Sequence, residues 1–301
     1  MEQKVHKIFW RIGQEITPET FIQADNYICS QHNLIRRLIA SNNYGLLPQT
    51  EVDAPSLSIQ TNVNNKDVYI EKLVCSGTTS TGYLIEMENH MVTSLPKKHL
   101  TIPDSEAKSL YIVLRVNPFE QVLINPVTNE DAPAAHYAYE LNIRELDQIG
   151  EDELAIIKIN NSNNTPVIDH DYIPPCMSVN SCSKLLEIYK LIKQLLTEIL
   201  SHVEHKGYLV GTAIYPLRML HDEFDEFSLL SPPVALIRLV KKIIRTCQFF
   251  IPDLRTIASP DFLREYNHND ASITFKSLLS CLQDISKIVG QGKEDDFMPR
   301  I

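Results

Sequence analysis

The chain has 301 residues, enough for about two domains with buried cores. Its 28 Lys and Arg against 38 Asp and Glu leave a formal net charge of −10. This charge argues against a general binder of nucleic acids or anionic membranes, because both depend on cationic surfaces. With only 9 Gly among 301 residues, glycine-rich phosphate cradles are not expected either.

The N-terminus lacks the apolar stretch of an export signal, and no later window approaches the roughly 18 apolar residues that a membrane span needs. We therefore expect a cytoplasmic chain that does not insert into a membrane. The six cysteines are scattered and contain no C-x-x-C pair. They are expected to be reduced and mostly buried, without a disulfide framework or a zinc knuckle.

The first predicted element is a helix over Pro18–Ala40. Thr17 can cap it, and proline suits the first helical position because its missing N–H would have no partner there. Gly45 and Pro48 end the pattern. The apolar residues that recur at helical spacing are Phe21, Tyr27, Ile28, Leu34, Ile35, Leu38 and Ile39.

From residue 54 to about 160 the hydrophobic period becomes that of β-strands. Leu57–Val63 and Tyr137–Ile143 alternate apolar and polar residues, and Leu110–Val116 and Leu154–Ile159 are continuous apolar runs. Turn residues separate these segments. Six or more short strands without intervening helices predict a β-sandwich.

After Ile173-Pro174-Pro175-Cys176 the period is again helical. One apolar stripe has the spacing of a coiled-coil a/d seam, with a histidine at the next d position. Its residues are Leu185, Ile188, Ile192, Leu195, Ile199 and His202. Further helices are predicted near 213–227, 231–249 and 274–288. The prediction is an α+β chain, with an N-terminal helix and antiparallel β-sandwich over 1–175 and an α-helical bundle over 176–301.

Two segments have partial signatures of known sites. Gly77–Gly82 has the outer glycines of a phosphate loop, but Tyr83 and Leu84 stand where that loop needs Lys and Ser or Thr, so a hairpin turn is favoured. Glu198, His202 and His205 share one helical face and could ligate a metal. Because no H-E-x-x-H motif or second ligand cluster accompanies them, a polar end of the seam is the favoured interpretation.

Two further segments are rich in possible ligands. Asp169-His170-Asp171, followed by Cys176 and Cys182, could suggest zinc or a thiol nucleophile, but a turn leaving the sandwich is favoured. The carboxylates of Asp222–Glu226 are expected to form a solvated acidic face, which could also dock a basic partner. We expect no catalytic residue, cofactor or resident metal.

Three separated segments share residues with one protein family. The first contains Trp10, Gly13, Pro18, Phe21, Asp25 and Tyr27, the second Ile173, Pro174 and Pro175, and the third Tyr266, His268 and Asp270. In this order they resemble TssK, the baseplate adaptor family of type VI secretion systems. The second segment is similar to the family's junction between a β-sandwich shoulder and a helical neck, and the third to the start of the last neck helix.

The resemblance implies a homotrimer whose shoulders attach to the TssF and TssG wedge proteins. The seam that includes Ile188 and Ile192 would then be a threefold neck interface. Phe21 and Tyr27 are expected in the core, and Trp10 either packs on the sandwich or contacts the wedge. The sequence ends about where the family's head domain begins, so the contact with a membrane-anchor protein stays open.

The leading hypothesis is a cytoplasmic, non-enzymatic, homotrimeric baseplate subunit at the inner face of the cytoplasmic membrane, with no nucleic-acid partner. A phage or phage-tail-like receptor-binding or adaptor protein is the first alternative. A metal-dependent hydrolase is the second, and it would use His202 and His205 or the segment Asp169–Cys176.

Overall fold

The computed structural model describes residues 6–40, 43–49, 55–103, 107–123, 135–162, 165–205, 214–250, 254 and 266–291. The chain forms two compact units. The first contains Met1–Leu46 and Ser56–Asp169, and the second contains Leu47–Pro55 and His170–Ile301. The division predicted from the sequence, after residue 175, differs in two places: the chain leaves the first unit after Asp169, and Leu47–Pro55 joins the second unit.

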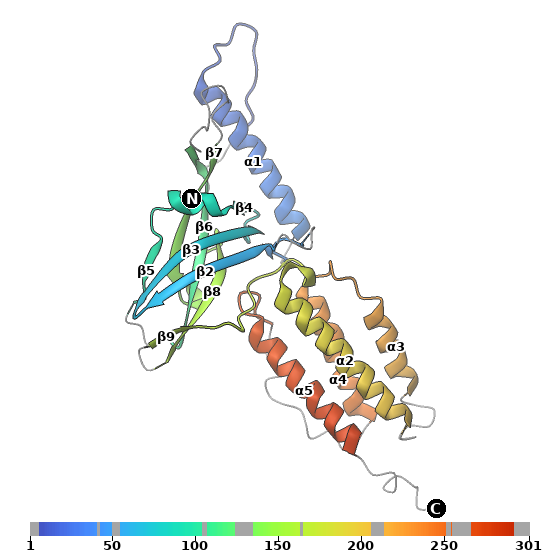
Figure 1. The fold of residues 1–301 in the computed structure, drawn as a ribbon. Helices are drawn as coiled ribbons and strands as arrows, with labels where there is room; N and C mark the ends of the chain where they lie inside the picture. The colour runs from blue at the N-terminus through green and yellow to red at the C-terminus, as the bar shows by residue number, and fades with distance from the viewer. Residues whose placement is uncertain are drawn as a thin grey trace, which may run out of the picture. The chain divides into compact units, whose positions relative to one another are not determined.

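Where the structure describes it, the first unit consists of one long helix and two antiparallel sheets (Figure 1). The helix α1 covers Pro18–Ala40, the bounds that its cap and stop residues predict. In the first sheet, β3 pairs with all four other strands: β1 (Gly45–Leu46), β2 (Leu57–Asn64), β3 (Asp67–Thr78), β4 (Leu84–Met87) and β5 (His99–Thr101). The second sheet has the order β7-β6-β8-β9: β6 (Ser109–Leu123), β7 (Ala135–Arg144), β8 (Glu153–Ser162) and β9 (Thr165–Ile168). Two 3-10 helices, η1 (Asn89–Ser94) and η2 (Leu146–Gln148), lie in connections.

The continuous apolar runs predicted as strands form the centre of the second sheet. Leu110–Leu114 of β6 and Leu154–Ile157 of β8 are buried at every position. Strands buried on both faces have no reason to alternate, whereas the half-exposed β2 does alternate. The hairpin predicted at Gly77–Gly82 is confirmed, since Thr78 of β3 pairs with Leu84 of β4.

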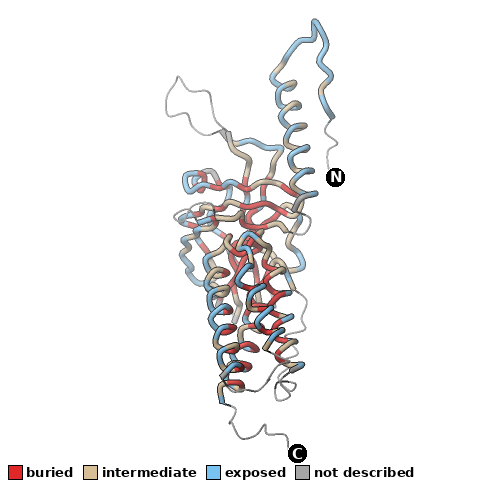
Figure 2. Tube along the Cα trace, turned by 90° about the vertical axis from the view of Figure 1, so that its right-hand side faces the viewer, coloured by how far each residue is buried: buried red, intermediate tan, exposed pale blue. Residues whose placement is uncertain are grey.

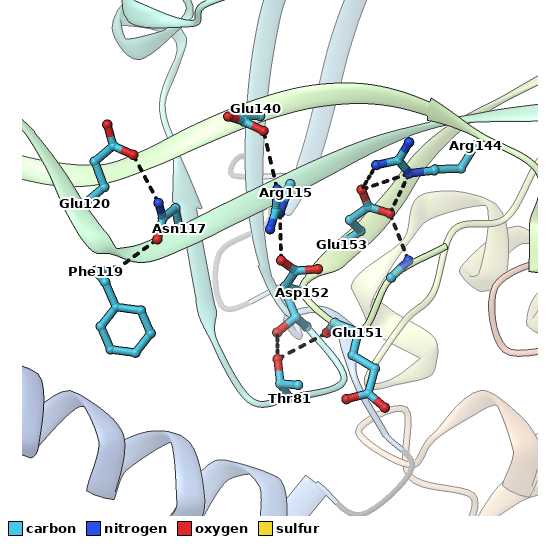
Figure 3. A network of polar contacts seen from close by, with 12 residues as sticks. Thr81, Arg115, Asn117, Phe119, Glu120, Glu140, Arg144, Glu151, Asp152 and Glu153 are labelled. Atoms are coloured by element: carbon cyan, nitrogen blue, oxygen red, sulfur yellow. Dashed lines mark hydrogen bonds and ion pairs between the residues drawn. The ribbon is translucent and has the colours of Figure 1, made fainter. Parts of the chain in front are cut away.

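A network of ion pairs joins β6, β7 and the start of β8 (Figure 3). Glu153 is only 3% exposed, and its carboxylate accepts hydrogen bonds from Arg144 Nε at 3.1 Å and from the Gly150 amide at 2.8 Å. Arg115 bonds Asp152 at 2.7 Å and lies 3.7 Å from Glu140. The pKa of Arg115 is raised, chiefly by its hydrogen bond to Asp152. The buried carboxylate is therefore fully paired, as burial of a charge requires.

In its described residues, the second unit has a 3-10 helix and four α-helices that contact one another in a ring. They are η3 (Val179–Ser181), α2 (Ser183–His205), α3 (Ile214–Asp225), α4 (Pro233–Phe250) and α5 (Ser272–Gln291). In this ring α2 packs on α3 and α5, and α4 packs on the same two helices (Figure 1). α4 begins at Pro233, the first-turn proline that predicted it. Leu236, Phe275 and Leu282 lie fully buried among these helices.

Candidate assembly surfaces

The helix α1 carries a large exposed apolar surface. Figure 2 shows most of α1 in the colour of exposed residues. Large hydrophobic side chains exposed in residues 6–40 are Phe9, Trp10, Ile12, Ile16, Phe21, Ile22, Ile28, Leu34, Ile35 and Leu38. An apolar surface of this extent is typical of a protein interaction site rather than of a free monomer surface.

α1 touches its own unit with a polar side. The Cys29 thiol and the Tyr137 hydroxyl of β7 form a hydrogen bond of 3.1 Å. Gly82, in the β3–β4 turn, is so close to α1 that a Cβ there would lie 2.6 Å from the carbonyl oxygen of Asn33. Burial raises the pKa of Tyr137 to about 12, so its phenol stays protonated. Polar residues thus anchor the helix while its apolar residues point elsewhere.

This orientation changes the expected role of the N-terminal motif. Phe21 is not in the core of the single chain but 59% exposed, because α1 turns its polar side to the sheets. Tyr27 is half-buried and Asp25 exposed. Trp10 is 51% exposed in the single chain, and its contact with the wedge stays a prediction. Gly13 has a positive φ of 80°, which glycine adopts without strain.

The coiled-coil stripe predicted from the sequence lies on α2, and we call its residues the α2 seam: Leu185, Ile188, Ile192, Leu195, Ile199 and His202. Most of these side chains lie inside their own chain. Leu185, Ile192, Leu195 and Ile199 are buried between α2 and its neighbours α3 and α5. Ile188 and His202 are half-buried. Because four of the six residues already have apolar partners within one chain, little of the stripe remains for a second copy. The threefold seam stays a prediction.

The second and third motif segments lie together at the start of the second unit. Ile173, Pro174 and Pro175 are buried. The Tyr172 hydroxyl donates to the carbonyl oxygen of Asn269 at 2.8 Å, which ties the two segments together. In the third segment, Tyr266 Oη lies 2.7 Å from His268 Nδ1, and the Asp270 carboxylate accepts a hydrogen bond from the amide of Ser272 at 3.3 Å. These motif residues hold the beginning of α5.

The side chains of Cys176 and Cys182 interact with each other. Cys176 Sγ lies 3.2 Å from the Pro174 carbonyl oxygen, and it also contacts Cys182. A hydrogen bond from Cys176, together with the amides of Leu185 and Lys184, lowers the pKa of Cys182 to about 7. Asp171 bonds Lys276 at 2.9 Å, which lowers the pKa of that carboxyl. Among the residues that the structure describes, no three His, Cys, Asp or Glu side chains are placed to hold a metal.

The residues of the other two predicted clusters, the possible metal ligands near His202 and the carboxylates of Asp222–Glu226, make separate contacts and do not come together in one site. Glu198 accepts from Gln194 at 3.0 Å and from Ser286 at 3.4 Å, and the side chain of His205 lies outside the described residues. In the acidic helix, Glu223 pairs with Lys242 at 2.5 Å and Asp225 with Lys193 at 3.0 Å. The carboxylates therefore meet cations from different helices and do not converge on one site.

In the part of the chain that is described, no helix combines the length and apolarity needed to cross a bilayer.

The sequence matches no protein-family model and no curated protein.

Solved structures, in contrast, match the chain over nearly its whole length. The crystal structure of TssK covers 94% of this chain and 69% of its own, with a TM-score of 0.62 and 14% identity. The chain has the fold of TssK. TssK from T6SS EAEC in complex with a nanobody covers 89% of this chain and 68% of its own, with a TM-score of 0.58 and 13% identity.

A chain of the type VI secretion system TssK-TssF-TssG baseplate subcomplex, solved by cryo-electron microscopy, also matches. It covers 94% of this chain and 100% of its own, with a TM-score of 0.59 and 14% identity. The resemblance to TssK that three short segments indicated is thus confirmed for the fold, and so is the α+β class.

Proposed function

We propose that the chain is a structural baseplate subunit of a type VI secretion system. In this role it is a non-enzymatic, homotrimeric adaptor that attaches the baseplate wedge to the cell-envelope anchor, at the cytoplasmic face of the inner membrane. One observation carries the proposal: the fold matches TssK over 94% of the chain, and it also matches a chain of the TssK-TssF-TssG subcomplex. Its partners are TssF-like and TssG-like wedge proteins.

The two units suit this role. In the proposal, the two sheets pack as a β-sandwich shoulder and α2–α5 form the helical-bundle neck. Three copies would present three shoulders to the wedge, so that several modest contacts add up to stable attachment. The acidic surface around Asp222 and Glu226 is exposed and gives such an assembly a place for basic partners.

The stretch before α1 is the part of the chain that we assign to the wedge. Phe9, Trp10, Ile12 and Ile16 are exposed within a few residues of one another. Exposed tryptophan next to other large apolar residues is typical of the centre of a protein interface, where truncation to alanine costs about 2 kcal/mol or more of binding free energy.

Co-purification tests this function. The tagged chain, co-expressed with TssF-like and TssG-like proteins of the same organism, should retain both. The Trp10→Ala/Ile12→Ala variant should retain at least about tenfold less TssF-like or TssG-like protein than the wild-type chain, because a loss of about 2 kcal/mol of binding free energy weakens binding by more than that factor. Tyr215→Ala/Met219→Ala is the control, because Tyr215 and Met219 are also large, exposed apolar side chains but lie on α3.

Failure of the wild-type chain to retain TssF-like or TssG-like protein would overturn the wedge role. If that chain were nevertheless an oligomer, the phage-tail-like adaptor would become the better explanation.

A further inference from the structure

The helix α4 carries a stripe of positive charge along its exposed side. Arg238, Lys241, Lys242 and Arg245 follow one another at spacings of three, one and three residues, so they share one face of the helix and span about 11 Å of its axis. Phe249 continues this face one turn further on and is 71% exposed. We call these five residues the α4 stripe.

The α4 stripe is at odds with the composition of the chain. The whole chain has a net charge of −10, but α4 contains these four cations and no Asp or Glu. Like charges three and four residues apart on a helix repel one another and destabilise it. Arg238 and Arg245 each have Lys241 and Lys242 at these distances. A face that only contacts water gains nothing from such repulsion, so the stripe is better explained by a partner that neutralises it.

The chain itself neutralises only part of this charge. Lys242 Nζ donates to a carboxylate oxygen of Glu223 on α3 at 2.5 Å, and Lys241 is half-buried. Arg238 and Arg245 are exposed, and within the described ranges neither guanidinium has an ion-pair partner. The two arginines are therefore available to an anion from outside the chain.

A hollow of about 530 Å³ lies along the α4 stripe. It is lined by the four cations together with Thr246 and Phe249. This volume falls in the range of binding pockets, roughly 300 to 1,000 Å³. The long stems of Arg and Lys provide apolar contact area beneath their charged ends. A bound segment would thus find both cations and apolar surface in one place.

We propose that the α4 stripe binds an acidic segment of another protein. With Phe249 the stripe is about 16 Å long, which about five extended residues of a partner would span. The segment has several Asp or Glu side chains that meet the cations, and a large apolar side chain at the end that meets Phe249. The surface is separate from the stretch before α1 that we assign to the wedge, so the inference goes beyond the proposed function and does not depend on it.

A short acidic segment fits the stripe better than an anionic membrane or a nucleic acid. Both of those present a negative surface far larger than the stripe, and the chain outside α4 is itself acidic, so most of such a contact would be repulsive. The repulsion begins at the border of the stripe, where Glu223 lies against Lys242. A segment of a few residues contacts the cations alone.

The test measures the binding of a fluorescein-labelled peptide, four glutamates followed by leucine, to the full chain by fluorescence anisotropy. The wild-type chain should bind it, and more weakly at about 150 mM than at about 50 mM salt, because salt screens the attraction. Arg238→Glu/Arg245→Glu should weaken binding at least about tenfold, since two attractive contacts become repulsive. A peptide with glutamines in place of the glutamates should not bind.

Lys190→Glu/Lys287→Glu is the matched control. It changes the net charge of the chain by the same amount, at exposed positions of α2 and α5 outside the stripe, and should bind the glutamate peptide as the wild type does. Equal weakening in this variant would overturn the proposal, because the attraction would then belong to the charge of the whole chain.

Two further variants separate the binding contacts from damage to the fold. Arg238→Lys/Arg245→Lys keeps the charges and should bind within about twofold of the wild type. Phe249→Ala should weaken the peptide that ends in leucine by about threefold and leave a peptide that ends in serine unchanged, because only the leucine meets the ring. Equal effects on both peptides would overturn the contact with Phe249.

The absence of binding to the wild type at up to about 0.5 mM chain would overturn the proposal. So would tighter binding to phosphatidylserine vesicles or to a short DNA duplex, which would assign the stripe to a membrane or to a nucleic acid. A lower mass of Arg238→Glu/Arg245→Glu by light scattering would assign it to a second copy of the chain. Retention of the TssF-like and TssG-like proteins is measured separately, so failure here leaves the baseplate role intact.

Discussion

Cys182 illustrates how local contacts change the chemistry of a residue that the sequence shows only as one cysteine among six. It stands at the start of α2, where the Cys176 thiol and two backbone amides stabilise its thiolate. Helix N-termini lower thiol pKa values for the same reason. Cys75 is the opposite case, because burial raises its pKa to about 12.

We predict that Cys182 is the cysteine whose alkylation by iodoacetamide rises around neutral pH. Its thiolate is half populated at a pH of about 7, the value that its hydrogen bonds impose, so the rate should rise through that pH and level off above it. Mass spectrometry of modified peptides checks this, and Cys182→Ser should abolish the neutral-pH phase. A rate that keeps rising to about pH 9, the value of an ordinary thiol, would contradict the prediction.

At the scale of elements, the attachment of α1 depends on a glycine far away in sequence. Gly82 has a positive φ of 89°, and it lies under the carbonyl group of Asn33. A methyl group there would meet helix backbone, which cannot move aside as a flexible side chain can. The turn therefore allows α1 to approach the sheet.

Gly82→Ala should loosen α1. Strain at positive φ costs about 1 kcal/mol, and displacement of the helix adds to it, so we expect amide hydrogen exchange in α1 to accelerate about tenfold or more. Gly13→Ala is the matched control, because its φ is also positive but nothing lies within 4 Å of the added methyl group. Equal acceleration in both variants would show that contact with Asn33 does not anchor the helix.

At the scale of the whole molecule, each unit has its own core. Glu153 lies in the first unit and Ile192 in the second, both nearly inaccessible to water. Units with separate cores respond separately to substitutions in either one. This independence also offers a way to distinguish folding from assembly.

Ile192→Ala should lower the free energy of unfolding of the second unit by about 3 kcal/mol through the cavity it leaves. Glu153→Ala should lower that of the first unit by about 2 kcal/mol, because Arg144 and the Gly150 amide lose their shared acceptor. Hydrogen exchange at increasing urea resolves the two units, and the effects should add in the double variant.

The decrease in unfolding free energy caused by Ile192→Ala should be the same at all protein concentrations, since this side chain is buried in its own chain. A loss that grows on dilution would instead support the α2 seam as an interface between copies.

Much of the architecture was determined by local sequence. The cap at Thr17, the proline at position 233, the apolar run of β6 and the turn at Gly77–Gly82 each predict an element that the structure contains. These signals work because caps, φ preferences and hydrophobic period act within a few residues. The short motif segments likewise identified a TssK-like fold, which the solved structures confirm.

What only the tertiary structure decided is which apolar stripe is already covered. The stripes of α1 and α2 both have helical a/d spacing, and from the sequence the α2 stripe was the predicted interface while Phe21 was expected in the core. The structure buries Ile192 among the chain's own helices and leaves Phe21 exposed. Periodicity shows that a helix has an apolar side, but the packing of distant elements, such as Gly82 and Tyr137 against α1, determines where that side points.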